Sequence, residues 1–454
     1  MFKSKIVKLV VNDVRFPTSL EQHGSDAMHS DPDYSVAYVV VETDADLKGY
    51  GLTFTVGRGT EIVVCAVEAL SSLVIGKTLE EIVTDFSAFY RLLTSDGQMR
   101  WIGPEKGVIH LATAAILNAI WDMWARAESK PLWKLLVDMD PRKLIRCIDF
   151  RYITDALTEQ EALDILEKAK AGKEEREEQM LKEGYPAYTT SCAWLGYSDE
   201  QLSQLCSAAL AEGWTRFKVK VGADLQDDIR RCSLIRKMIG PENTLVLILV
   251  VLMIDANQRW NVGEAVSWIT TLAEFRPLWI EEPTSPDDIL GHAAISKALV
   301  PLGIGVATGE QCHNRVMFKQ FLQASALQFV QIDSCRVGSV NENLAILLMA
   351  AKFKVPVCPH AGGVGLCELV QHLILFDYIS LSASLNNRMC EYVDHLHEHF
   401  RSPTVIKNAH YMPPTDPGFS CEMLDESVQK YGFPHGDVWR SILKQKGSQD
   451  NFSE

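Results

Sequence analysis

Between residues 188 and 392 the sequence alternates short apolar segments with helical ones, and this alternation limits the possible folds more than any other feature. A run of strand–helix units favours a parallel sheet, and eight such units close naturally into a (β/α) barrel. We therefore expect an α/β barrel over this part of the chain. The predicted strands are Tyr188–Cys192, Arg216–Val221, Val251–Asn257, Leu278–Glu282, Ile304–Thr308, Phe329–Ile332, Val355–Pro359 and Tyr378–Ser382.

Three further parts flank the predicted barrel. Residues 1–140 form a first unit, with predicted strands at Ile6–Val14 and Ala37–Thr43 and a clear helical pattern at Leu111–Ala127. Residues 141–187 are charge-rich and helical, which is typical of a solvated connection. Residues 393–454 are mixed and contain several prolines.

The segment TRFKVKVG, residues 215–222, carries two lysines within one predicted strand. Its charged and apolar residues alternate, so Lys218 and Lys220 point to the same face. Lys220 stands at the carboxyl end of the strand, where barrels place their active sites. Taken alone, this pattern is more typical of a half-exposed strand with two solvated lysines. The ends of the other strands change that interpretation.

Acidic residues stand at the ends of the next three strands. Asp255, Glu281 and Glu310 are in phase with these strands, and three converging carboxylates need a cation to remain ionised together. Oxygen ligands alone suit Mg²⁺. Any one of these acids can be a helix cap or an ion-pair partner, but three in phase favour a metal site. Asn257 shares the face of Asp255 and can donate to a substrate oxygen.

Asp333 and His360 end two later strands, which we expect on the opposite side of the barrel. A carboxylate bound to one histidine nitrogen selects the tautomer and raises the pKa of the ring, so the pair can act as an acid or a base. Two ammonium groups beside Mg²⁺ repel each other. We therefore expect the pKa of Lys218 or Lys220 to fall toward about 7 to 8, the range useful to a general base.

Composition excludes some classes of protein. The net charge of -15 and the lack of a basic patch argue against a nucleic-acid partner. The 11 cysteines are scattered, without a CxxC pair or a secretory signal, and indicate reduced thiols in an intracellular protein.

One stretch, Leu245–Ile254, is apolar throughout but only about half as long as a bilayer span. We expect a buried strand with an apolar extension there, and no membrane. An extension that shifts the register by an odd number would turn Asp255 away from the cavity.

The motifs Lys218-x-Lys220, Asp255-x-Asn257, Glu281-Glu282-Pro283 and Gly309-Glu310, together with Asp333 and His360, resemble the enolase superfamily, mandelate racemase subgroup. Stretches such as DAMHSDPDYS, WIEEPTSPDDILGH and PHAGGVGLCELVQH extend the resemblance over nearly the whole chain and are most similar to L-fuconate dehydratases. The resemblance implies a (β/α)7β TIM-like barrel under an α+β capping domain. The N-terminal region would form this cap, and the C-terminal segment would return to it.

The same resemblance implies Mg²⁺ held by Asp255, Glu281 and Glu310, and a lysine or histidine base. It implies dehydration of L-fuconate to 2-dehydro-3-deoxy-L-fuconate. Lys220 would remove the proton at carbon 2, Lys218 would stabilise the enediolate, and His360, oriented by Asp333, would protonate the leaving 3-hydroxyl. The implied substrate contacts are Gly24, Ser25, Asp26, Tyr34, Lys218, Lys220, Asn257, Glu281, Glu310, His360 and Glu391.

Three alternatives remain open at this point. A racemase or epimerase could use the same lysine and histidine, a Schiff-base aldolase could use Lys218 or Lys220, and the apolar extension could leave a protein that only binds ligands. The resemblance implies a mitochondrial location, with the cytoplasm as the alternative, and is compatible with a homo-oligomer.

Overall fold

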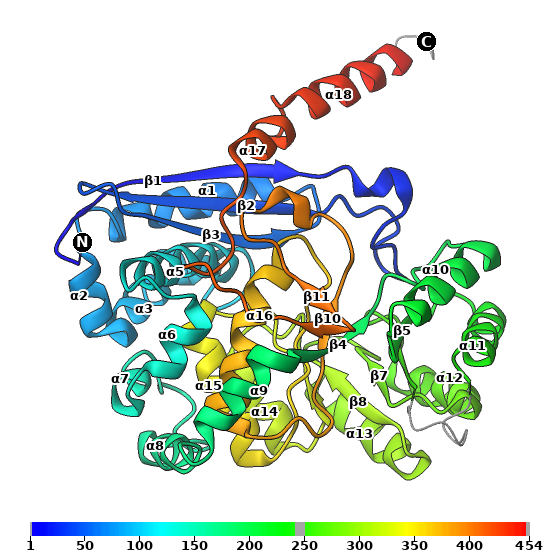
Figure 1. The fold of residues 1–454 in the computed structure, drawn as a ribbon. Coiled ribbons are helices and arrows are strands. Elements are labelled where there is room, and N and C mark those ends of the chain that lie inside the picture. Colours follow the sequence, from blue (N-terminus) through cyan, green and yellow to red (C-terminus); the bar gives the residue numbers. More distant parts are fainter. Residues whose placement is uncertain (1, 241–249, 451–454) are drawn as a thin grey trace.

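In the computed structural model, which describes residues 2–240 and 250–450, a capping domain lies over a parallel barrel (Figure 1). The expected fold class is confirmed. The predicted apolar extension at residues 245–249 lies outside the described residues, whereas the strand that follows it is present.

The cap is built on a three-stranded antiparallel sheet in the order β1-β2-β3. Its strands are β1 (Ile6–Arg15), β2 (Ser35–Thr43) and β3 (Lys48–Thr55). Its helices are α1 (Thr60–Leu70), α2 (Leu79–Thr84), α3 (Phe86–Thr94), α4 (Met99–Ile102), α5 (Gly107–Ala127) and α6 (Leu132–Asp138). The predicted strands and helix of this part are confirmed, and β3 is an additional strand.

Helix α5 packs directly against β3. A Cβ atom on Gly51 would meet the carbonyl oxygen of Ala115 at 2.3 Å and the amide nitrogen of Ala119 at 2.3 Å, so only glycine permits this approach. By length and composition α5 could cross a membrane, but 94% of its most apolar window is buried inside the protein. In this structure it is the central helix of the cap.

A helical connection leads from the cap to the barrel through α7 (Pro141–Ile145), α8 (Glu159–Lys168) and α9 (Lys173–Glu183). The barrel strands are β4 (Tyr185–Thr189), β5 (Arg216–Lys220), β6 (Val251–Asp255), β7 (Trp279–Glu281), β8 (Gly305–Thr308), β9 (Phe329–Val330) and β10 (Cys390–Tyr392). The barrel helices are α10 (Asp199–Ala211), α11 (Leu225–Ile239), α12 (Val262–Leu272), α13 (Ile289–Leu299), α14 (Arg315–Gln323), α15 (Ser339–Phe353) and α16 (Leu366–Asp377).

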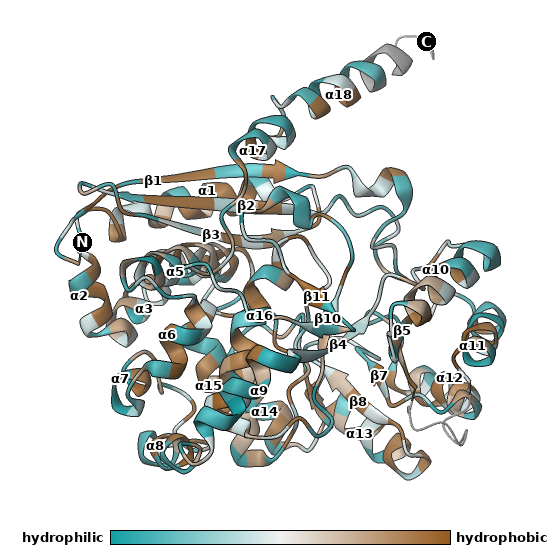
Figure 2. Ribbon diagram, viewed as in Figure 1, coloured by the Kyte–Doolittle hydropathy of each residue, from teal (hydrophilic) through white to brown (hydrophobic). Residues whose placement is uncertain are grey.

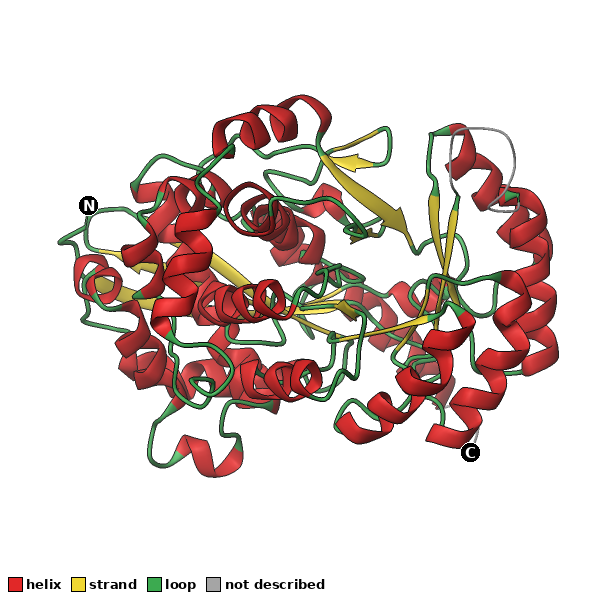
Figure 3. Ribbon diagram, turned by 90° about the horizontal axis from the view of Figure 1, so that it is seen from below, coloured by secondary structure: helices red, strands yellow, loops and turns green. Residues whose placement is uncertain are grey.

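The barrel strands run parallel in chain order from β4 to β9, and helices surround them (Figure 3). Residues 358–359 continue the sheet from β9 to β10. The amide of Cys358 donates to the carbonyl of Val330 in β9 at 2.8 Å, and the amide of Glu391 in β10 donates to the carbonyl of Pro359 at 3.3 Å. Strand β10 pairs in parallel with β4, and this pairing closes the barrel. A small apolar cluster that includes Tyr188, Met253 and Trp279 fills the interior below the strand ends.

One strand prediction is wrong, one is confirmed only as a short pairing, and one is shifted. Residues 378–382 form a buried π-helical turn that continues α16, because a short apolar run can belong to a buried helix as well as to a strand. The strand beside β4 is instead β10. At 355–359 the predicted strand is present only as a single parallel bridge, from Val357 to Val330 of β9. Strand β4 begins at Tyr185 rather than at Tyr188.

The C-terminal segment returns to the cap, as the resemblance implies. It contains the hairpin strands β11 (Ile406–Lys407) and β12 (His410–Tyr411), then α17 (Asp425–Tyr431) and α18 (Asp437–Asp450). The amide of Met423 donates to the hydroxyl of Tyr38 at 3.1 Å, and the indole of Trp439 donates to the carbonyl of Arg15 at 2.8 Å. Helix α18 extends away from the cap and carries mostly hydrophilic residues (Figures 1 and 2).

Candidate active site

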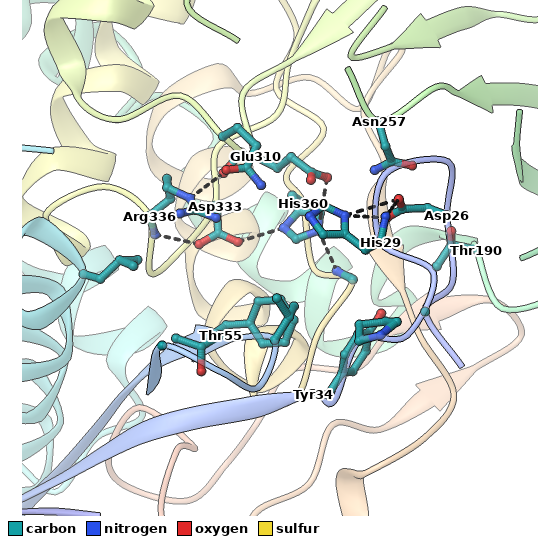
Figure 4. Close-up of a pocket in the computed structure, with 18 of the residues that line it drawn as sticks. Asp26, His29, Tyr34, Thr55, Thr190, Asn257, Glu310, Asp333, Arg336 and His360 are labelled. Atoms are coloured by element: carbon teal, nitrogen blue, oxygen red, sulfur yellow. Dashed lines mark hydrogen bonds and ion pairs between the residues drawn. The ribbon is translucent and has the colours of Figure 1, made fainter. Parts of the chain in front are cut away.

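A cavity of about 280 Å³ lies between the cap and the carboxyl ends of the barrel strands (Figure 4). Both domains contribute to its walls. The expected site residues that line it are Gly24, Asp26, Tyr34, Lys220, Asn257, Glu310, Asp333, His360 and Glu391. The expected residues outside this lining are Ser25, Lys218, Asp255 and Glu281, and the last three are buried and linked by ion pairs to each other or to the lining residues.

Two of the three expected metal ligands, Asp255 and Glu281, lie side by side because their strands are in register, and Glu310 follows the end of the next strand, β8. Asp255 pairs with Lys220 on one side and with Glu281 on the other, so all three point to the same face. Asp255 is therefore not turned away from the cavity by the register shift considered above. One oxygen atom each from Asp255, Glu281 and Glu310 lies within 4.8 Å of the others, a donor set that fits Mg²⁺. The cofactor prediction is confirmed at this level.

The electrostatics of this group also favour a cation. Although burial alone would raise it, the pKa of Asp255 is lowered to about 2 by Lys220 and Lys218. Burial raises the pKa of Glu281 to about 8, and repulsion from Asp255 and Glu391 adds to this rise while Lys218 opposes it. Crowded carboxylates behave in this way when their negative charge exceeds the nearby positive charge. A divalent ion would let all three ionise.

The two lysines occupy different places. The Nζ atom of Lys220 lies 2.6 Å from Oδ2 of Asp255 and 3.0 Å from Oδ1 of Asn257, at the cavity wall. Lys218 lies deeper, 1% exposed, with Nζ 2.6 Å from Oε1 of Glu281 and 2.7 Å from Oε1 of Glu391. Lys218 is therefore a buried cation held between carboxylates.

The expected fall in lysine pKa presumed Mg²⁺ beside the ammonium groups, and the protein's own side chains act in the opposite direction. Burial alone would lower the pKa of both lysines, but Asp255 outweighs it for Lys220, and Glu281 with Glu391 outweighs it for Lys218, so both values are raised. The expected fall considered only the repulsion among the two ammonium groups and Mg²⁺. It left out the carboxylates that lie directly against the ammonium groups.

His360 and Asp333 form the expected pair. Nδ1 of His360 lies 2.7 Å from Oδ2 of Asp333, while Nε2 lies 3.3 Å from Oε2 of Glu310. The other oxygen of Asp333 accepts from the amides of Cys335 and Arg336, which fixes the carboxylate. Burial would lower the pKa of His360, but Glu310 and Asp333 outweigh it and raise the pKa to about 9. Glu310 and Asp333 therefore favour the protonated form of the ring.

The cap closes the cavity with a loop between β1 and β2. Gly24 has φ +77°, and a Cβ atom there would lie 2.3 Å from the hydroxyl of Tyr34, so the loop requires glycine. Asp26 accepts from the amides of Met28 and His29 at 2.7 Å each and so presents an ordered carboxylate. Ser25 instead anchors the loop, because its carbonyl accepts from the amide of Leu195 on the barrel side at 3.2 Å.

Sequence reasoning missed several wall residues. His29 pairs with Asp26 through Nδ1, 3.1 Å from Oδ2, and Arg336 donates through Nε to the carbonyl of Glu310 at 3.1 Å. Thr190 and Trp194 follow β4, so a search of that strand end would have found them. The apolar part of the wall is formed by Phe54, Val56, Val63, Val108 and Leu111.

Two family models match the chain. Residues 11–137 match "Mandelate racemase / muconate lactonizing enzyme, N-terminal domain", and residues 201–427 match "Enolase C-terminal domain-like". Together they cover both the cap and the barrel.

The most similar relatives cover nearly the full chain. Human mitochondrial enolase superfamily member 1 is 72% identical over 98% of this chain and 99% of its own. Its crystal structure has a TM-score of 0.95, covering 97% of this chain and 99% of the human one. L-galactonate dehydratase of Hypocrea jecorina is 52% identical over 93% of this chain and 92% of its own.

A more distant structure shares the fold. L-talarate/galactarate dehydratase of Salmonella typhimurium, crystallised with Mg and L-lyxarohydroxamate, is 21% identical with a TM-score of 0.72, over 94% of this chain and 92% of its own. The family models, the near full-length identity and the shared fold agree with the carboxylate group and the lysine and histidine around the cavity. This chain belongs to the enolase superfamily, in its mandelate racemase / muconate lactonizing enzyme group.

Proposed function

We propose that this protein removes water from a sugar acid, with L-fuconate as the substrate and 2-dehydro-3-deoxy-L-fuconate as the product. One observation carries the proposal: two proton-transfer groups, Lys220 and His360, reach the same cavity beside a cluster of three carboxylates. The relatives named L-galactonate dehydratase and L-talarate/galactarate dehydratase support a sugar-acid substrate.

Mg²⁺ bound by Asp255, Glu281 and Glu310 would supply positive charge for the substrate carboxylate as the adjacent proton is lost. Lys220 then takes the proton from carbon 2. Once the charge of Asp255 is neutralised, the pKa of Lys220 falls toward the range of a base, and Asn257 keeps its Nζ atom oriented. Lys218, buried below, stabilises the negative charge that develops on the substrate.

His360 completes the reaction. Its Nδ1 atom is held by Asp333, so the proton on Nε2 is available to the 3-hydroxyl as the bond between carbon 3 and oxygen breaks. The lost hydroxyl leaves as water, and the remaining enol takes a proton at carbon 3 and releases the proton of its 2-hydroxyl to become a 2-keto-3-deoxy acid. Each group therefore moves one proton at one atom.

The proposal is tested with a panel of L-fuconate, L-galactonate and galactarate, each incubated with Mg²⁺ or with EDTA while keto acid is measured. We expect keto acid from L-fuconate only with Mg²⁺, and none from Lys220→Ala or His360→Asn. Equal product with EDTA, or full activity of Lys220→Ala, would overturn the mechanism. Turnover of another acid alone would overturn the choice of substrate.

Lys220 and His360 both line the cavity, and this also suits a racemase or epimerase in which each group serves one face of carbon 2. Recovered substrate that has exchanged its carbon-2 proton with solvent, with no keto acid formed, would favour this second function. The name of the human relative further suggests a mitochondrial location, which a fluorescent fusion of the full chain would test.

A further inference from the structure

A buried ionic cluster joins the cap to the barrel and takes no part in the chemistry proposed above. We call it the Glu342 cluster, and it consists of Glu342, His110, Arg315, Glu105 and Asp149. The side chain of Glu342 is 0% exposed, and those of His110 and Arg315 are each 1% exposed. Such burial of charge needs a structural or functional reason.

Glu342 uses both carboxylate oxygens on three separate segments. Oε1 accepts from the amide of Arg315 at 2.8 Å and from Nη1 of the same residue at 3.0 Å. Oε2 accepts from the amide of Gly338 at 2.6 Å and lies 2.7 Å from Nε2 of His110. One carboxylate thus connects two barrel loops and the cap helix α5.

Each of these segments carries part of the cavity wall. Arg315 begins α14 at the end of the loop that starts with Glu310, and Gly338 ends the loop that starts with Asp333. Figure 4 shows Glu310 and Asp333 on two sides of His360, which contacts both. In α5, the neighbours of His110, Val108 and Leu111, form part of the apolar wall.

Arg315 links Glu342 to further segments of the chain. Its guanidinium lies 3.1 Å from Oε1 of Glu105 and 3.4 Å from Oδ2 of Asp149, and donates to the hydroxyl of Tyr90 at 3.3 Å. Replacing a buried ionic group by apolar residues of the same size is often neutral or stabilising, so stability alone does not explain this cluster. A role in positioning the loops that carry Glu310 and Asp333 does explain it.

We propose that Glu342 is a positioning residue that aligns the Glu310 loop, the Asp333 loop and the cap wall through His110 and Arg315. For its effect on catalysis this inference rests on the proposed function. Its effect on metal binding does not, because Glu310 is a ligand whether or not the substrate is correctly assigned.

The test compares His110→Phe with a matched control, Trp121→Phe. The first variant keeps a ring of similar size beside Tyr90 but removes the bond to Glu342. The control removes another hydrogen bond between the same helices α5 and α15, from Nε1 of Trp121 to Oδ1 of Asn341 at 2.8 Å. Asn341 bonds onward to the carbonyl of Cys147, away from both catalytic loops.

We expect His110→Phe to bind Mg²⁺ several-fold more weakly by calorimetry, since Glu310 is less well placed. We also expect kcat to fall at least roughly tenfold with little change in KM, because a displacement of about 1 Å can cost about a hundredfold in rate. Trp121→Phe should lower the unfolding temperature yet keep the Mg²⁺ affinity and the kcat of the parent protein. His110→Gln, whose amide can reach Glu342, should recover part of the loss.

Parent-like Mg²⁺ affinity in His110→Phe, or equal losses in the control, would overturn the positioning role. If His110→Phe does not fold, the milder Glu342→Gln, which keeps the shape of the side chain but removes its charge, gives the same comparison. If no sugar acid is turned over by the parent protein, the proposed function fails. The affinity comparison still decides the positioning role.

Discussion

Replacing Lys218 by methionine should destabilise the protein strongly in the absence of a divalent ion. Lys218 Nζ lies 2.6 Å from Glu281, 2.7 Å from Glu391 and 3.4 Å from Asp255, all of them buried. Removing one partner of a buried ion pair costs about 3–5 kcal/mol, because the remaining charge stays uncompensated. Here three carboxylates lose a shared cation. We therefore expect a loss at the upper end of that range in EDTA.

Urea unfolding of Lys218→Met, followed with EDTA and again with saturating Mg²⁺, measures this effect. Mg²⁺ should restore much of the lost unfolding free energy, because it neutralises the same carboxylates. Lys220→Met is the matched control: among the described residues its Nζ forms an ion pair with Asp255 alone, and its side chain is 11% exposed, so the loss should be smaller. A Lys218→Met protein as stable as its parent in EDTA would refute the reasoning.

The remaining predictions concern the metal, the cap and pH. Mg²⁺ should raise the unfolding temperature of the parent protein but not of Asp255→Asn, as seen by differential scanning fluorimetry. Gly51→Ala should cost about 1–3 kcal/mol in urea unfolding, since its Cβ would meet Ala115 at 2.3 Å. The pKa of His397 is raised from 6.5 to about 9, because Glu368 outweighs burial. Its stabilisation, about 3 kcal/mol, is therefore complete below pH 6.5 and lost as pH rises through about 9, and His397→Gln should remove this dependence.

The barrel could be predicted where a strand ends in a polar residue and a helix follows. Strands β5 to β8 meet this condition and lie where they were expected. Residues 378–382 do not meet it, since their apolar pattern continues α16 and is satisfied inside a helix. Strand β3 escaped notice because Gly49 and Gly51 weaken its strand signal, and their reason lies in the distant helix α5.

The candidate site follows from the same rule, with one group per strand end. Asp255 and Glu281 converge because their parallel strands are in register, and Glu310 joins them from the loop that follows the carboxyl end of β8. Glu391 had no such signal, since its short strand β10 was not expected, and it was named by resemblance alone. The effect of the carboxylates on the lysine pKa was missed for a related reason, because Glu391 is one of the carboxylates that hold Lys218. The pKa values of these buried lysines depend on contacts between segments that are distant in the sequence.

The most direct test of the central claim is the exchange of the carbon-2 proton of L-fuconate in deuterium oxide with Mg²⁺, followed by NMR. In the proposed mechanism Lys220 removes that proton and His360 assists the departure of the 3-hydroxyl. His360→Asn should therefore incorporate deuterium at carbon 2 without forming keto acid, and Lys220→Ala should do neither. Exchange that persists in Lys220→Ala and disappears in His360→Asn would contradict this assignment.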